Sequence, residues 1–215
     1  MRPNVLLVVL DAARRDSLEP YGAAPGSSPA IADVARMGSA LSNAFATACW
    51  TAPSHASMFT GLLPRRAGMG HAPGGTPSRC RAAMEAHRER NCAEVLHRAG
   101  YATKALSANL WVSERSGFSL GFEEFRAVTS GRQARIHGGL RARAAWALEA
   151  ARGRADDGAR EAGQIIQGWL ESPHDRPFFW FVNLVECHSP YLPPRPYSDV
   201  SLLVRLRAAE EARRH

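Results

Sequence analysis

Lysine is nearly absent from this chain of 215 residues: Lys104 is the only one, and arginine supplies the rest of the 27 basic residues. The formal net charge of +7 would suit a nucleic-acid partner. The arginines lie in Ala/Arg-rich stretches, however, and do not alternate with aromatic residues as they do in a groove that binds nucleic acid. We therefore expect no nucleic-acid partner.

Cysteine pairs and long apolar runs are missing too. The four cysteines form no C-x-x-C motif, which excludes zinc-ribbon and redox motifs of that spacing. The apolar run at residues 5–10 is too short for a signal peptide or a membrane span. Together with 22% charged and 45% hydrophobic residues, these absences predict a cytoplasmic globular protein with reduced thiols and no membrane span.

Two apolar runs, at residues 5–10 and 178–184, dominate the pattern that is present. The first run is continuously apolar rather than alternating, which suits a strand buried on both faces, as in the middle of a parallel sheet. The second run is predicted to form another buried strand. Asp11 and His188 follow these two runs. Ligand sites in open α/β sheets lie outside the carboxyl ends of the strands, so Asp11 is a candidate metal ligand. The alternative for Asp11 is a helix N-cap.

Helix and strand patterns alternate between these runs, which favours a mainly parallel sheet flanked by helices. We expect helices at residues 29–38, 92–101, 132–170 (with a break at 153–158) and 200–215. A strand is expected at residues 102–107 and a further strand or extended segment at 41–48. We also expect a long loop at 65–83 and an aromatic turn packed into the core at 117–125.

The segment from Thr51 to Gly61 concentrates hydroxyl groups at the start of an expected helix. Pro53 suits a first helical turn, and Gly61 suits a helix end. Thr51 would then lie just before a helix N-terminus, where free backbone N–H groups favour an anion. The pattern indicates either a nucleophile for a phosphate or sulfate ester at Thr51, or an N-cap at Thr51 or Ser54.

Four segments in this order resemble the sulfatases of the alkaline-phosphatase-like superfamily: residues 2–16, 51–64, 117–125 and 178–194. Residues 51–55, Thr-Ala-Pro-Ser-His, are similar to the family's nucleophile motif, which is Cys or Ser, any residue, Pro, Ser, Arg. Residues 188–194 resemble the family's His-x-Pro-Tyr-x-Pro-Pro. The resemblance implies an alkaline-phosphatase-like α/β fold, with residues 1–215 forming the N-terminal portion of a catalytic domain.

The same resemblance implies roles for single residues. Asp11 would bind a divalent metal ion, by resemblance calcium, with zinc, manganese or magnesium as alternatives. Thr51 would hold the nucleophile position and His55 the position of the supporting arginine. His188 would contact the ester or its leaving group. The residues implied to contact the small sulfate or phosphate ester are Ser54, Arg14 and Asn109.

Several positions depart from the family pattern. Threonine cannot be oxidised to formylglycine, because its Cβ would become a ketone, so a catalytic Thr51 would act directly as an alkoxide. Ala12 stands where a second carboxylate is frequent. The Gly-Lys-Trp-His segment is absent, and Asn109 is the polar substitute. The family's later Asp-Asn or Asp-His metal pair is also absent from these residues.

Three interpretations follow from these matches and departures. The first is a sulfatase-like, metal-dependent hydrolase of sulfate or phosphate esters, whose metal site is incomplete in this chain alone. The second is an inactive, truncated relative that binds an anion, or binds a partner chain supplying the missing metal ligands. The third is an α/β binding module without ester chemistry.

Overall fold

The chain folds into two compact units in the computed structural model, which describes residues 2–69, 76–128, 139–154 and 156–188, together with 193, 194, 197, 201, 203 and 204. The first unit holds Met1–Asp11 and Thr47–His215, and the second holds Ala12–Ala46. The first unit contains all four strands of the described sheet.

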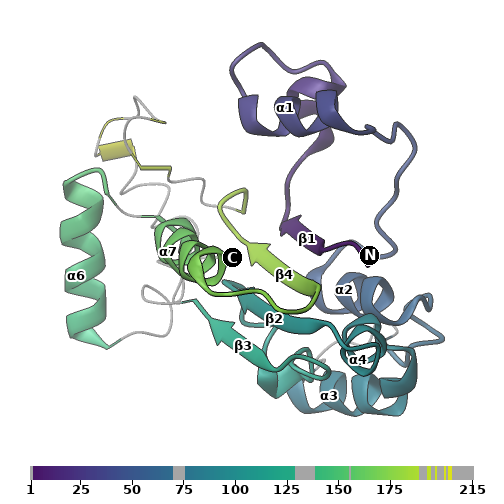
Figure 1. Ribbon diagram of the computed structural model, residues 1–215. Coiled ribbons are helices and arrows are strands. Elements are labelled where there is room, and N and C mark those ends of the chain that lie inside the picture. Colours follow the sequence, from purple (N-terminus) through teal and green to yellow (C-terminus); the bar gives the residue numbers. More distant parts are fainter. Residues whose placement is uncertain are drawn as a thin grey trace. The chain divides into compact units, whose positions relative to one another are not determined.

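The four strands form one parallel sheet in the order β1-β4-β2-β3 (Figure 1). Because all strands run the same way, their carboxyl ends meet at one edge of the sheet. The predicted mainly parallel α/β fold is therefore confirmed. The strands are β1 (Val5–Leu10), β2 (Ala102–Ser107), β3 (Glu124–Ala127) and β4 (Phe178–Leu184).

The run at residues 178–184 forms a buried strand, as predicted, whereas the run at residues 5–10 does not lie in the middle of the described sheet. β4 lies between β1 and β2, and its five inner residues are buried. Within the described residues, β1 pairs with β4 alone and forms an edge. Its Leu6 and Val8 side chains are 54% and 49% exposed. The continuous apolar pattern of residues 5–10 thus predicted the strand, but not whether other elements bury both of its faces.

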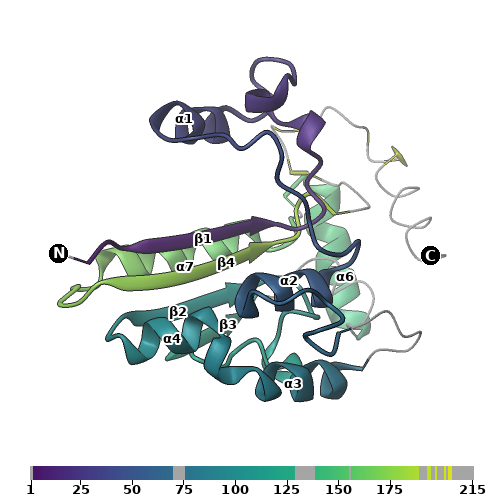
Figure 2. The ribbon, with the colours of Figure 1, turned by 90° about the vertical axis from the view of Figure 1, so that its right-hand side faces the viewer.

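Alternating side chains of β4 build two hydrophobic cores, one on each face of the sheet. Phe179 and Phe181 pack in the core that includes helices α2, α3 and α4. Trp180 and Val182 point the other way and pack with Trp169 of helix α7. Figures 1 and 2 show α7 on one side of the sheet and α2, α3 and α4 on the other.

The helices largely follow the predicted ranges. The expected break within residues 132–170 falls between α6 (Leu140–Ala151) and α7 (Ala159–Glu171). Within the described part of the chain, no helix has the length and apolarity needed to cross a membrane. The other helices are α1 (Pro29–Met37), α2 (Thr51–Thr60), α3 (Pro77–Ala86), α4 (Cys92–Arg98), and the short 3-10 helices η1 (Arg15–Ser17), η2 (Glu19–Tyr21), η3 (Arg88–Arg90) and η4 (Glu114–Ser116).

Two local predictions are wrong, and a third lies largely outside the described residues. The expected loop at 65–83 contains the start of α3, because Thr76 caps the helix by accepting a hydrogen bond from the Arg79 N–H, and Pro77 follows in the first turn. Residues 41–48 form no strand, and they contain a turn at 42–43 and bends at 47–48. The predicted helix at 200–215 falls almost entirely outside the described residues.

The aromatic turn at residues 117–125 packs into the core, as predicted. Phe118 and Phe122 contact Phe59 of α2, with ring centroids 5.7 and 6.0 Å apart. Gly121 is required by close approach, because a Cβ there would lie 2.2 Å from the backbone nitrogen of Glu94. The turn therefore fixes α2 and α4 against the same cluster.

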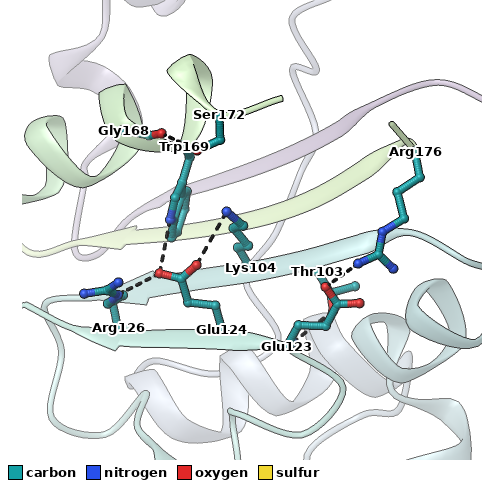
Figure 3. A network of polar contacts seen from close by, with 9 residues as sticks. All are labelled: Thr103, Lys104, Glu123, Glu124, Arg126, Gly168, Trp169, Ser172 and Arg176. Atoms are coloured by element: carbon teal, nitrogen blue, oxygen red, sulfur yellow. Dashed lines mark hydrogen bonds and ion pairs between the residues drawn. The ribbon is translucent and has the colours of Figure 1, made fainter. Parts of the chain in front are cut away.

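A polar network joins α7 to β2 and β3 on the opposite face (Figure 3). The partly buried Glu124 carboxylate accepts hydrogen bonds from Arg126 Nε at 2.7 Å and Trp169 Nε1 at 3.3 Å. Lys104 Nζ lies 3.5 Å from the same carboxylate. Burial raises the pKa of Glu124, but the hydrogen bonds from Arg126 and Trp169 and the charges of Lys104 and Arg126 outweigh burial and lower it.

We predict that Glu124→Ala lowers the free energy of unfolding by about 1–3 kcal/mol, since it removes the acceptor of a buried indole N–H and the partner of a partly buried ammonium group. Glu85→Ala is the matched control, because it removes an ion pair with Arg81 that lies exposed on α3 and should cost less than about 0.5 kcal/mol. Urea denaturation measures both, and equal losses would contradict a special role for the Glu124 network.

Candidate active site

The candidate site lies at the carboxyl end of β1. The backbone N–H of Asp11 donates to the carbonyl of Leu184 at 2.8 Å, which extends the pairing of β1 with β4 by one residue. The next residue, Ala12, has a φ of 62°. A residue with a Cβ adopts this left-handed conformation at an energetic cost, and such strain concentrates at functional sites. The chain thus turns sharply away directly after the Asp11 carboxylate.

Thr51 and Asn109 meet Asp11 at this point. The Thr51 hydroxyl donates to Asp11 Oδ2 at 3.2 Å. The Asn109 side-chain amide donates to the same oxygen at 2.5 Å and lies 3.3 Å from Thr51 Oγ1. Three residues from distant parts of the chain, all predicted site residues, are therefore in direct contact.

Asn109 is oriented by its own loop. Its Oδ1 accepts a hydrogen bond from the backbone N–H of Trp111 at 2.9 Å, so the amide nitrogen is the group directed at Thr51. Trp111 in turn makes an edge-to-face contact with Trp50, at 5.7 Å between ring centroids. Asn109 is thus held in position beside the Thr51 hydroxyl.

The start of α2 differs by one residue from the prediction. Thr51 is the first helical residue, and Trp50 is the N-cap without a side-chain capping bond. The Thr51 hydroxyl is not used for capping, since it points to Asp11. The N-terminal end of a helix favours negative charge, and here it lies beside a hydroxyl that is free of the capping role.

His55 lies beneath this helix start, buried against the sheet. Its Nδ1 is 2.8 Å from the Thr51 carbonyl oxygen and its Nε2 is 3.0 Å from Nδ2 of Asn183. The rings of Phe118 and Phe181 enclose it. Burial lowers the pKa of His55, which the hydrogen bond to Thr51 and the charge of Asp11 only partly offset. The ring therefore contacts the backbone of Thr51 and is neutral near pH 7.

His188 follows β4, at the sheet edge that also carries Asp11. Its backbone N–H donates to the Val185 carbonyl at 2.9 Å, and its side chain is partly buried. The neighbouring Glu186 carboxylate accepts hydrogen bonds from the backbone N–H groups of Asp157 at 3.1 Å and Ala159 at 2.8 Å. These contacts tie the His188 segment to the start of α7.

The other two predicted substrate contacts are placed less directly. Ser54 lies on the first turn of α2, partly exposed. Arg14 belongs to the second unit, where its guanidinium pairs with Asp16 through contacts of 3.0 and 2.5 Å. That ion pair lowers the pKa of Asp16, chiefly through the hydrogen bond from Arg14.

The described residues do not complete a metal site. A hard divalent cation takes six or more oxygen ligands, several of them carboxylates. Asp11 is the carboxylate at this position, and within the described ranges no group of three or more His, Cys, Asp or Glu side chains gathers to hold a metal ion. Among the described residues, Asp11 could therefore serve as one ligand of a metal site, but the remaining ligands are not present.

The sequence analysis missed two buried polar residues next to this site, Ser107 and Asn183. Ser107 ends β2 and Asn183 lies near the end of β4. Both are fully or almost fully buried. Both are polar residues near the carboxyl end of a predicted strand, and this position in the sequence could have identified them as candidate site residues.

These features define a class of fold and site: a parallel α/β sheet with a hydroxyl nucleophile candidate at a helix start, facing a carboxylate at a strand end. The family model for sulfatases matches residues 3–201, and the chain belongs to the sulfatase family. Sulfatases generally use a divalent metal ion.

Individual relatives agree with this assignment. The chain is 33% identical over 103 residues to an N-acetylgalactosamine-6-O-sulfatase of Bacteroides thetaiotaomicron, across 47% of this chain and 19% of that protein. Its fold is similar to the crystal structure of a phosphonate monoester hydrolase of Agrobacterium radiobacter, with a TM-score of 0.58 and 21% identity over 91% of this chain and 43% of the other.

A second solved structure, Ps i-CgsB in complex with k-i-k-neocarrahexaose, has a TM-score of 0.55 and 18% identity over 88% of this chain and 46% of the other. These likenesses confirm the alkaline-phosphatase-like fold. The chain spans less than half the length of each of the three relatives.

We predict that acid destabilises the protein through His55. The unfolded chain takes up a proton on this histidine near pH 6.5, whereas burial keeps the folded form neutral to lower pH. The His55 contribution is therefore fully present above pH 6.5 and is lost as the pH falls below it, by at most about 1.4 kcal/mol per pH unit.

Denaturation of wild type and His55→Gln between pH 7.5 and 5.5 measures this contribution. The wild type should lose about 1 kcal/mol more than the variant over this range. His174→Gln is the control, because His174 is exposed, and it should keep the wild-type slope. Identical slopes for wild type and His55→Gln would contradict a buried neutral ring.

Proposed function

We propose that these residues form the nucleophile-bearing part of a sulfatase-family hydrolase of sulfate or phosphate esters, with Thr51 as the nucleophile. The observation that supports this most directly is the Thr51 hydroxyl, which stands at a helix N-terminus and is hydrogen-bonded to Asp11 and Asn109. A hydroxyl needs a neighbouring acceptor to become a nucleophile.

In the proposed reaction, Thr51 Oγ1 attacks the sulfur or phosphorus atom of the ester. Its proton moves along the existing hydrogen bond to Asp11 Oδ2. The bond to the leaving oxygen breaks, and His188 donates a proton to that oxygen. Water then attacks the threonyl ester and gives one proton to His188. The bond to Thr51 Oγ1 breaks, this oxygen takes back its proton from Asp11, and sulfate or phosphate is released. The N–H groups at the start of α2 and the Asn109 amide stabilise the charged oxygens.

Threonine fits this direct route better than the formylglycine route. Formylglycine is an aldehyde, and oxidation of Thr51 would give a ketone. The chemistry proposed here therefore requires no oxidation of the side chain.

We predict that Thr51→Ala lowers turnover of aryl sulfates or bis-aryl phosphates at least about a thousandfold, since it removes the attacking atom. Thr51→Ser should retain part of the activity, because it keeps the hydroxyl. Met58→Ala is the control, because this residue is exposed on the same helix. Assays with added calcium, manganese, zinc or magnesium test this, and full activity of Thr51→Ala would contradict the proposal.

The metal ion proposed by resemblance is calcium, held in part by Asp11. The remaining ligands would come from sequence outside the described site, on this chain or on a partner chain. The position of Asp11 at the strand end, with no carboxylate beside it at Ala12, supports this division.

We predict that calcium, manganese, zinc and magnesium at millimolar concentrations shift the melting temperature of this chain by less than about 2 °C, since a ligand stabilises the native state only when it occupies a site there. Asp11→Asn is the matched variant. A rise of several degrees in the wild type that Asp11→Asn abolishes would show that the 215 residues bind the metal ion by themselves.

A further inference from the structure

A continuous hydrogen-bond path of three buried side chains runs under the candidate site. His55 of α2, Asn183 of β4 and Ser107 of β2 are 3%, 0% and 3% exposed. His55 Nε2 lies 3.0 Å from Asn183 Nδ2, and the Ser107 hydroxyl lies 3.3 Å from Asn183 Oδ1. The path therefore connects a helix to two neighbouring strands.

The chemistry of the Thr51 end fixes the direction of the two hydrogen bonds that His55 makes. The Thr51 carbonyl only accepts, so His55 Nδ1 must carry the proton and donate at 2.8 Å. Burial disfavours the charged ring, so Nε2 is left as an acceptor for the Asn183 amide. Asn183 Oδ1 is then free to accept from the Ser107 hydroxyl.

Both ends of the path lie on the backbone of site residues. One end is the Thr51 carbonyl. At the other end, Ser107 Oγ accepts from the Asn109 backbone N–H at 3.1 Å and lies 3.3 Å from the Asn109 carbonyl oxygen. The side chains of Thr51 and Asn109 meet 3.3 Å apart at Asp11. The path thus joins the backbones of two residues whose side chains form the site.

Packing around the ring makes this arrangement costly to change. The rings of Phe118 and Phe181 stand edge-on to His55, with centroids 6.1 and 6.2 Å away. A buried donor or acceptor that loses its partner here has no water to replace it. Movement of Thr51 relative to Asn109 would therefore break at least one bond of the path.

We propose that His55, Asn183 and Ser107 are positioning residues for the reaction, and that they hold Thr51 and Asn109 in register through a neutral His55 with its proton on Nδ1. This inference rests on the proposed function for its catalytic consequence. His55 then acts on the nucleophile through the backbone, and not as the charged contact that the family's arginine position implies.

The tautomer of His55 is the first test and does not depend on turnover. Nitrogen-15 NMR of the histidine rings should show His55 neutral with the proton on Nδ1 from pH 8 to pH 6. In Asn183→Asp the new carboxylate accepts but cannot donate, so His55 should become doubly protonated at pH 7. A wild-type ring with its proton on Nε2 would overturn the proposal.

The matched control is Ser57→Ala, on the same helix. Ser57 is buried, and its hydroxyl has no hydrogen-bond partner among the described residues. This variant should leave the His55 spectrum unchanged. Circular dichroism tests whether each variant is folded. If Asn183→Asp does not fold, Ser107→Ala serves as the second variant of the path.

The positioning role is tested by kinetics and by hydrogen exchange. Ser107→Ala should lower kcat about tenfold with KM within about twofold, as losses of residues that orient reacting groups do, while Ser57→Ala leaves both unchanged. An unchanged kcat in Ser107→Ala would overturn the role.

If the wild type turns over no substrate, the proposed function fails and the exchange measurement still decides the path. The backbone amide of Asn109 should then exchange at least about tenfold faster in Ser107→Ala, because this substitution removes its hydrogen-bond acceptor. The amide of Val128, which donates to the Ser107 carbonyl, is the reference and should not change. Equal rates at Asn109 in the wild type and Ser107→Ala would overturn the path.

Discussion

The parallel pairing of β1 with β4 is the constraint on which the site depends. It joins residues about as far apart in sequence as the described chain allows, with Leu10 opposite Leu184. Because β4 also pairs with β2, the ends of three strands lie along one edge. Asp11, Asn109 and His188 each follow one of these strands. A shift in the register of β4 would move the Asn183 amide away from both of its partners.

Much of this arrangement follows from the sequence, for physical reasons that can be stated. The apolar runs at 5–10 and 178–184 favour strands of a parallel sheet, so the polar residues that follow them are expected at its carboxyl edge. Pro53 and Gly61 delimit α2, and they do so because one fits a first turn and the other adopts a φ of 68°. Asp11 and Thr51 were found in this way, whereas Asn109 was named only through the resemblance to the sulfatases.

Other features depend on contacts that no local pattern contains. Whether both faces of β1 are covered depends on the elements that pack against it. The sequence around Leu6 and Val8 does not reveal that these two side chains are exposed. Asn183 is a polar residue in an apolar strand, and its hydrogen-bond partner, His55, is known only from the tertiary structure. The role of Ser107 depends on the path of the loop to Asn109. These pairings arise from tertiary structure, which single-residue preferences do not encode.

The neutrality of His55 has a consequence for how charge is balanced at Thr51. The family's arginine would place a permanent positive charge beside the nucleophile, whereas a buried ring enclosed by Phe118 and Phe181 carries none near pH 7. In the described part of the first unit, the groups beside the Thr51 hydroxyl are the start of α2, the Asn109 amide and the negatively charged Asp11. A helix N-terminus supplies roughly half a positive charge, and an amide is only a dipole. A sulfate or phosphate ester at this point would therefore depend on cationic groups from outside this set more strongly than it would in a relative that keeps the arginine.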